Sequence, residues 1–249
     1  MGLRKRIFTW GDGVMSVVIG YVSDYFSIVM TDTRITYGKN AEMGWDDNVE
    51  KLVSIPNMGW ATGVGVFDFI HNFNRKLAKM KNTTARIIEE LFEKTLEHEK
   101  INNENLKAQF DSTVITCSWV GKEENKSKFR VGLLSKEHFG NRLMELGNNH
   151  ITILYPYDYL DDLSKVEYIE KRFNMHTEFD GNLGKLLQHL LQIFAEISAN
   201  SFGVSKICDI GIQVYLDNDL YKLHLKEDVR PLIKAAKDGT ILNKLSVVI

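Results

Sequence analysis

The sequence predicts an α+β fold in which two mainly antiparallel sheets are stacked and covered by helices. Segments with strand character come as hairpin-like pairs, and segments with helical periodicity also come in pairs. Grouped strands and helices differ from the strict strand–helix alternation of a parallel sheet. Strands such as residues 16–22 are almost continuously apolar, as expected where both faces of a sheet are covered. Together these observations predict a four-layer αββα sandwich.

The first half of the chain begins with sheet and continues with helix. Residues 16–22 and 25–31 are rich in β-branched and aromatic side chains and flank a two-residue turn, which is typical of a hairpin. Residues 51–55 and 58–65 repeat this pattern around Pro56–Asn57. From Val66 the apolar residues recur every three or four positions, which predicts helices over residues 66–80 and 84–99.

The second half repeats the order of sheet, helix pair and sheet. The wide leucine stripe between residues 183 and 200 is the strongest helical signal in the chain. The predicted strands are residues 112–120, 128–134, 142–146, 150–155, 206–216 and 220–225, and the predicted helices are residues 160–173 and 183–200.

Composition and length favour one globular domain spanning residues 1–249. The chain is 44% hydrophobic and 26% charged, which suffices for one large core. No linker-like stretch divides it, so residues 1–15 are interpreted as an N-terminal extension and residues 226–249 as a C-terminal tail. The last residues of that tail are mostly apolar, and contact with a neighbouring subunit or a partner groove is one interpretation of them.

Charge, cysteines and histidines exclude several functional classes. The net charge of −2 gives no basic surface for nucleic acid, and no apolar run reaches the roughly 20 residues of a membrane helix. Cys117 and Cys208 stand alone and no secretory segment opens the chain, which favours a cytoplasmic protein. The histidines are scattered without metal-ligand spacing, so neither a metal nor another cofactor is expected.

Four residues near the start have an ordered spacing that goes beyond these general features. Ser16 opens the segment SVVIG, in which Gly20 is the fifth residue, and Asp32 follows Ser16 by sixteen positions. Lys51 begins the third predicted strand. In this order the chain resembles the family of proteasome β-type subunits and their bacterial relative HslV, over residues 16–80.

The resemblance implies an N-terminal-nucleophile (Ntn) hydrolase fold and a set of site residues. The Ser16 hydroxyl would attack a peptide or other amide carbonyl while the free α-amine of the same residue accepts its proton. By the same resemblance, Asp32 would hold Lys51 charged beside the nucleophile, and the turn with Gly63 and Gly65 would supply an oxyanion donor. Ser205 and Asp209 are possible supporting residues from the same resemblance.

The proposed chemistry requires Ser16 to be the first residue, which leaves three functions open. Cleavage after Met15, or translation from Met15 followed by its removal, would free the amine. The first function is then a peptidase, for which the resemblance implies a homo-oligomeric ring and an ATP-dependent unfoldase as partner. The second is an inactive scaffold or regulatory binding protein that keeps its extension, and the third is an amidase acting on a small metabolite.

Overall fold

The structure is a computed structural model that describes residues 15–37, 43–56, 59–80, 83–123, 126–216 and 219–248. Within these ranges every pairing between named strands is antiparallel, and the largest sheet has the order β10-β1-β2-β11-β12-β13. Its strands are β1 (Val18–Val22), β2 (Phe26–Asp32), β10 (His150–Leu154), β11 (Ile207–Leu216), β12 (Asp219–Asp228) and β13 (Ser246–Val248).

A second sheet of the described chain has the order β5-β6-β7-β8-β9, and a short ribbon pairs β3 with β4. The members of the second sheet are β5 (Val53–Ile55), β6 (Gly59–Val64), β7 (Val114–Glu123), β8 (Lys126–Leu134) and β9 (Met144–Glu145). The ribbon consists of β3 (Ile35–Thr36) and β4 (Trp45–Asp46), directly after β2 in the chain.

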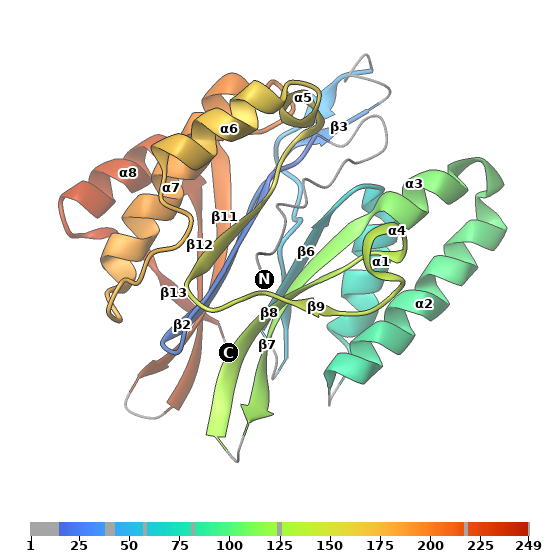
Figure 1. Ribbon diagram of the computed structural model, residues 1–249, viewed down its shortest axis with the longest axis horizontal. Coiled ribbons are helices and arrows are strands. Elements are labelled where there is room, and N and C mark those ends of the chain that lie inside the picture. Colours follow the sequence, from blue (N-terminus) through green and yellow to red (C-terminus); the bar gives the residue numbers. More distant parts are fainter. Residues whose placement is uncertain are drawn as a thin grey trace.

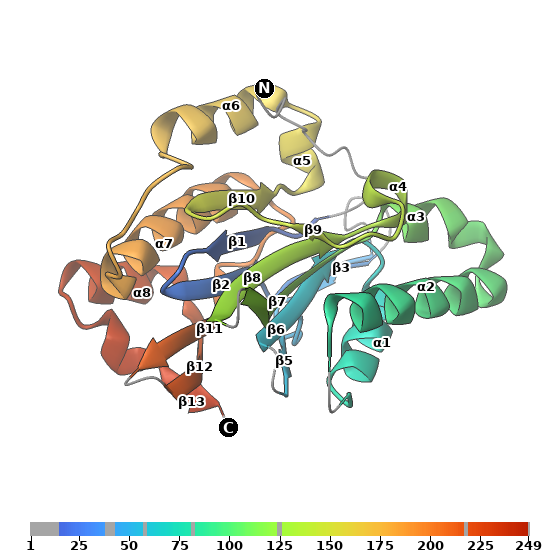
Figure 2. The same ribbon diagram turned by 60° about the horizontal axis from the view of Figure 1, so that its bottom comes forward.

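Helices flank the two sheets on opposite sides of the molecule, as Figures 1 and 2 show. Beside the second sheet lie α1 (Phe67–Leu77), α2 (Ala85–Asn102), the 3₁₀ turn η2 (Glu104–Leu106), α3 (Lys107–Ser112) and α4 (Lys136–Phe139). Beside the first sheet lie α5 (Tyr157–Leu160), α6 (Leu163–Arg172), α7 (Leu183–Asn200), α8 (Val229–Lys237) and the 3₁₀ turn η3 (Ile241–Lys244).

Strand β2 shows why the apolar runs are continuous. Successive side chains of a strand point to opposite faces. Ile28 and Met30 join the hydrophobic cluster that includes the leucines of α7, whereas Val29 joins a cluster shared with Trp60 of β6 and Val131 of β8. The two sheets therefore pack against each other through one cluster, and β2 is buried on both faces.

Several predicted boundaries differ from the structure, and two of them illustrate the cause. The helix predicted over residues 160–173 begins only at Leu163, as α6, because Asp162 caps it by accepting a hydrogen bond from the Ser164 amide, and Leu160 instead ends the separate helix α5. The strand predicted to start at residue 112 begins at Val114, since Ser112 ends α3. Both differences come from local capping that apolar periodicity does not report.

The C-terminal tail is structured within the chain itself. Residues after 225 complete β12, form α8 and end in β13, which pairs with β12 in the register Leu223 to Val247. Leu232 and Ala236 of α8 are buried in the cluster below the first sheet. In the described structure the tail therefore adds a strand to its own sheet, while its contact with a neighbouring subunit or a partner stays a prediction.

Candidate functional site

Strand pairing brings Ser16, Asp32 and Lys51 together from three separate segments. Strand β1 pairs antiparallel with β2, so the start of β1 lies beside the end of β2, with Val18 opposite Thr31. Ser16 precedes β1 by two residues, and Asp32 is the last residue of β2. Lys51 stands two residues before β5 in the second sheet. The site therefore lies where the two sheets meet at one end of their strands.

The Lys51 ammonium connects the other two residues. Its Nζ donates to Ser16 Oγ at 2.7 Å and contacts both oxygens of the Asp32 carboxylate at 3.1 and 3.2 Å. The Asp32 side chain is fully buried and that of Lys51 is 5% exposed, while Ser16 is partly exposed. A hydroxyl on a partly exposed residue thus lies next to a buried cation held by a buried anion.

Backbone amides hold the Asp32 carboxylate in place. Oδ1 accepts from the Val17 amide at 3.2 Å, and Oδ2 accepts from the Arg34 amide at 2.8 Å. The Ser205 amide also donates to Oδ2, at 3.4 Å. Both oxygens of this buried carboxylate therefore have hydrogen-bond donors. The position of the carboxylate in turn fixes the direction from which Lys51 approaches Ser16.

Burial lowers the pKa of Lys51 below its ordinary value of 10.5, and the Asp32 carboxylate partly opposes this shift. The cause is that a buried ammonium loses hydration, which one carboxylate replaces only in part. Lys51 can therefore give up or take back a proton more readily than a lysine in water. This is the behaviour required of a lysine that hydrogen-bonds to a nucleophilic hydroxyl.

The two predicted supporting residues have different positions. Ser205 adjoins the site, because its amide contacts Asp32 and its Oγ accepts from the Thr33 amide at 3.1 Å. Asp209 instead contacts His224, with 2.6 Å between Oδ1 and Nε2. The structure thus brings Ser205 to the Asp32 carboxylate, whereas the recorded partner of Asp209 is His224.

Packing alone explains why the two predicted oxyanion positions are glycines. Gly63 lies in β6 opposite Ile115, and a Cβ there would lie 2.6 Å from the Val114 carbonyl oxygen. Gly65 has φ +127°, and a Cβ there would lie 2.4 Å from Thr113 Oγ1. Among the contacts recorded for the described residues, none joins either glycine to Ser16.

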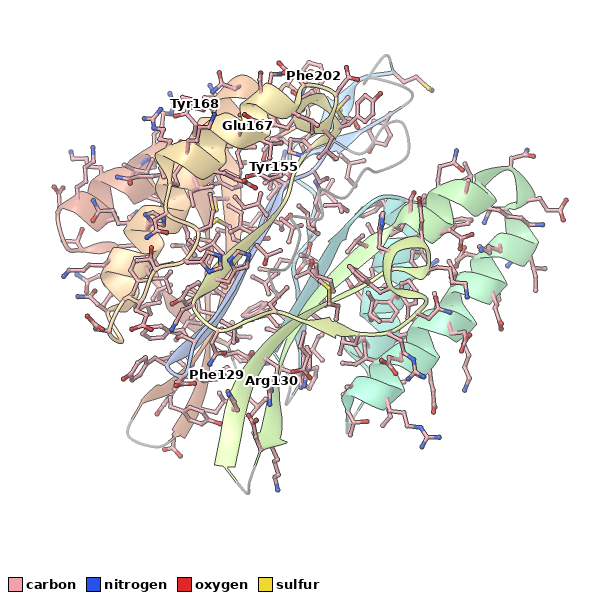
Figure 3. All side chains as sticks on the ribbon, viewed as in Figure 1. Phe129, Arg130, Tyr155, Glu167, Tyr168 and Phe202 are labelled. Atoms are coloured by element: carbon pink, nitrogen blue, oxygen red, sulfur yellow. The ribbon has the colours of Figure 1, made fainter. Side chains whose placement is uncertain are left out.

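Arg34 and Asp47, which connect the site to its surroundings, were not among the site residues predicted from the sequence. The Arg34 guanidinium binds Asp47 through two bonds of 2.5 and 2.8 Å and also donates to the Phe202 carbonyl. Arg34 follows Asp32 by only two positions. A cation so close to an aspartate at a strand end could have indicated that Arg34 adjoins the site. Phe202 lies at the upper end of the molecule in Figure 3, away from Phe129 of β8.

The residue before Ser16 is part of the packed structure. Met15, which directly precedes Ser16 in the chain, is 4% exposed. Residues 1–14 lie outside the described residues. Ser16 therefore carries an amide nitrogen here, which cannot act as a base.

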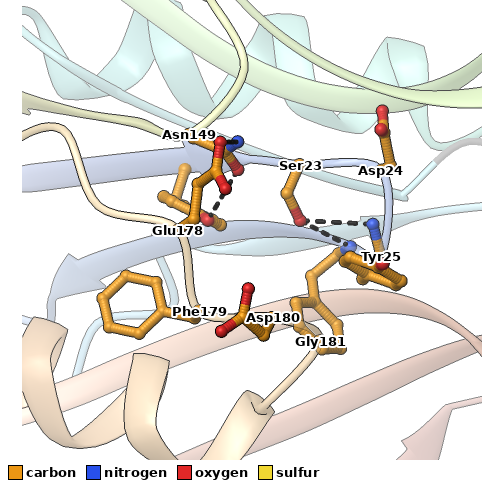
Figure 4. A pocket seen from close by; sticks show the side chains of 10 residues that line it. Ser23, Asp24, Tyr25, Asn149, Glu178, Phe179, Asp180 and Gly181 are labelled. Carbon is orange, nitrogen blue, oxygen red and sulfur yellow. Dashed lines mark hydrogen bonds between the residues drawn. The ribbon is translucent and has the colours of Figure 1, made fainter.

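A separate pocket of about 190 Å³ lies at the other end of the β1–β2 hairpin. Its lining includes Tyr21, Tyr25 and Phe179 together with the carboxylates of Glu178 and Asp180, as Figure 4 shows. Tyr21 and Tyr25 flank the hairpin turn, whereas Ser16 and Asp32 lie at the opposite strand ends. This pocket is therefore distinct from the site around Ser16.

Neither a membrane-spanning helix nor a metal-binding cluster is found in the part of the chain that the structure describes. None of the helices there combines the length and apolar character needed to cross a bilayer. The same residues contain no group of three or more histidine, cysteine or acidic side chains arranged to hold a metal ion.

Comparison with solved structures identifies similar folds at low sequence identity. Anbu from Hyphomicrobium sp. strain MC1 matches with a TM-score of 0.57 and 14% identity, over 91% of this chain and 96% of that one. Its Gly-1 mutant gives the same values over 92% and 96% of the two chains. Anbu (ancestral beta-subunit) from Yersinia bercovieri matches with a TM-score of 0.55 and 12% identity, over 94% and 99%. No family model and no curated protein sequence matches this chain.

These comparisons correct the family resemblance drawn from the sequence. The assignment to proteasome β-type subunits or HslV is wrong, because the structural neighbours are Anbu proteins, which are proteasome-like relatives. The motif around Ser16, Asp32 and Lys51 did not distinguish between these related groups. At 12–14% identity the likeness shows the fold alone, which is a mixed α/β fold with antiparallel sheets similar to that of the Anbu proteins.

Proposed function

We propose that this protein is an Ntn hydrolase that cleaves peptide or other amide bonds with Ser16 as nucleophile. The single observation that supports this function best is the 2.7 Å hydrogen bond from Lys51 Nζ to Ser16 Oγ, with Asp32 behind the lysine. We propose also that the two packed sheets and their outer helices form the four-layer αββα sandwich of such enzymes. The Anbu-like fold is compatible with this arrangement.

The first step in the proposal exposes the Ser16 amine. Ser16 Oγ attacks the Met15 carbonyl carbon while a neutral Lys51 amine takes the hydroxyl proton. The C–N bond then breaks as the Lys51 ammonium formed in this step returns the proton to the nitrogen, which leaves Met15 joined to Ser16 Oγ as an ester. Water hydrolyses this ester to a Met15 carboxylate, a Ser16 hydroxyl and a free α-amine. Translation from Met15 followed by its removal gives the same product.

Turnover then uses the freed amine as the base. The α-amine takes the Ser16 hydroxyl proton, Oγ attacks the substrate carbonyl carbon, and the developing oxyanion accepts a backbone hydrogen bond in the Gly63–Gly65 turn. The proton passes to the leaving amine, and water hydrolyses the resulting acyl ester. An ordinary α-amine has a pKa of about 7.7 to 8.0. A nearby Lys51 ammonium lowers it further, which favours the basic form at neutral pH.

One observation favours the second candidate, a catalytically inactive scaffold that keeps its N-terminal extension. Met15 is buried, so the uncut connection to Ser16 is well accommodated by the fold. In such a protein the Lys51–Asp32 pair would serve only to join the two sheets. Assembly into a homo-oligomeric ring and substrate delivery by an ATP-dependent unfoldase stay predictions for either function.

Peptide turnover tests the hydrolase. The full-length gene product is assayed with a panel of fluorogenic peptides, beside Ser16→Ala and the control Ser127→Ala, an exposed strand serine remote in sequence from the site. Loss of the nucleophile is expected to reduce turnover by roughly 10³-fold or more, whereas the control keeps wild-type turnover. Equal turnover by wild type and Ser16→Ala, or none by either, would overturn the hydrolase proposal.

A further inference from the structure

The side chain of Met15 lies directly on the backbone of Gly203. A Cβ built on Gly203 would lie 2.5 Å from Met15 Cβ, 2.6 Å from its Sδ and 3.0 Å from its Cγ. Real Cβ atoms essentially never show contacts under 3.0 Å. Both residues are buried. Residue 203 must therefore lack a side chain if the Met15 side chain is to occupy this position.

The segment around Gly203 is held from both sides. Before it, Ser201 Oγ donates to Asp158 Oδ1 at 2.8 Å, and the Phe202 carbonyl accepts from the Arg34 guanidinium. After it, Ser205 Oγ accepts a hydrogen bond from the Thr33 amide and forms a second one with the Thr33 hydroxyl. These hydrogen bonds hold the backbone of Gly203 in one position. The space beside Gly203 therefore has a defined size.

Met15 occupies the acyl side of the bond next to Ser16. Its carbonyl carbon is bonded to the Ser16 nitrogen, and this carbon is the one that Ser16 Oγ attacks when the amine is exposed. A substrate that acylates Ser16 Oγ presents its own carbonyl carbon to the same atom. The residue carrying that carbonyl then stands in the position that Met15 holds in the uncut chain.

We propose that the space filled by the Met15 side chain is the acyl-side specificity subsite of the Ser16 centre, with Gly203 as the residue that sets its size. This inference rests on the proposed hydrolase function and adds a substrate class to it. The preferred substrates are peptide amides whose acyl-side residue has an unbranched apolar side chain, such as methionine or norleucine.

Two substrates and one substitution test the subsite. Fluorogenic peptides that differ only in a methionine or a glycine on the acyl side are compared with the full-length gene product and with Gly203→Ala. The added methyl group occupies space that the methionine side chain needs. Gly203→Ala is therefore expected to lower kcat/KM for the methionine peptide roughly 10- to 100-fold, and to change it for the glycine peptide, which has no Cβ, by less than about threefold.

Two further variants keep the result interpretable. Gly147→Ala is the matched control, because a Cβ at this exposed glycine meets nothing within 4 Å. If Gly203→Ala fails to fold because Met15 clashes with it, Met15→Gly/Gly203→Ala relieves the clash, since glycine also removes the Cβ that would lie 2.5 Å away. Once residue 15 is removed, this double variant has the same sequence as the processed Gly203→Ala protein.

The possible outcomes distinguish a failure of the subsite proposal from a failure of the hydrolase proposal. An equal fall for both peptides, or no change for either, overturns the subsite and leaves the hydrolase proposal standing. Absence of turnover in the wild type removes the hydrolase and the subsite together. A selective loss for the methionine peptide supports both.

Discussion

Two buried carboxylates on neighbouring strands have different surroundings. Asp32 ends β2 and is 0% exposed, and Asp209 lies in β11 and is 1% exposed. Asp32 contacts the Lys51 ammonium, which also reaches the Ser16 hydroxyl at 2.7 Å. Asp209 contacts His224, whose ring stacks on Trp60 with 5.3 Å between the ring centroids.

The comparison shows that a buried charge by itself does not identify a reactive site. Both aspartates have a basic partner within hydrogen-bond distance, and both are excluded from solvent. Only the pair at Asp32 places its basic group against a hydroxyl that is partly exposed. The Ser16 hydroxyl beside Lys51 and Asp32 therefore distinguishes the candidate site from the pair of Asp209 and His224.

The largest effect is expected from Asp32→Asn. The substitution leaves the buried Lys51 ammonium without its counter-ion and turns an amide NH₂ group toward backbone donors. The free energy of unfolding should fall by about 3–5 kcal/mol, measured by urea denaturation. Asp32→Asn/Lys51→Met should recover part of this loss, because it also removes the unpaired charge. A single variant as stable as the wild type would contradict the account of this pair.

Asp209→Asn is the same substitution at the other carboxylate and should have a smaller effect. The asparagine oxygen can still accept from His224, so a charged hydrogen bond is replaced by a neutral one at a cost of about 1–2 kcal/mol. Peptide turnover should stay within about twofold of wild type, since Asp209 has no recorded contact with Ser16 or Lys51. A loss of turnover as large as that of Ser16→Ala would mean that Asp209 belongs to the site.

The pH dependence of stability should show the smallest effect. Burial lowers the pKa of Lys51, so between this lowered value and 10.5 the unfolded chain binds more protons than the folded chain. The contribution of Lys51 to the free energy of unfolding therefore rises as the pH rises through that window. Urea midpoints measured between pH 8 and 10.5 should increase less in Lys51→Met than in the wild type. If the urea midpoints of wild type and Lys51→Met increase equally with pH, folding does not lower the pKa of Lys51.

Much of the site could be predicted from the sequence because strand order and spacing are local properties. Ser16, Asp32 and Lys51 stand at the ends of apolar runs, and antiparallel pairing brings such ends together. Asp209 was predicted as a possible supporting residue, and the strand register explains why it lies away from Asp32. In the sheet Cys208 is opposite Asp32 and Asp209 is opposite Thr31, so Asp209 points to the other face.

The remaining features depended on packing between distant segments. The apolar spacing of Val229, Leu232 and Ala236 is compatible with a helix, but a short segment near the chain end gave no basis for placing α8 under the first sheet. The contact of Met15 with Gly203 joins residues 188 positions apart and has no sequence signature. Fold and local order were thus accessible, whereas the surroundings of Ser16 required the structure.

The mass of the intact protein, purified from cells expressing the full-length gene, tests the central claim most directly. If Ser16 is an N-terminal nucleophile, the main species lacks residues 1–15, and Ser16→Ala changes the extent of any self-cleavage at that bond. A main species that retains Met15 and the residues before it, in wild type and variant alike, would contradict the account and favour the scaffold.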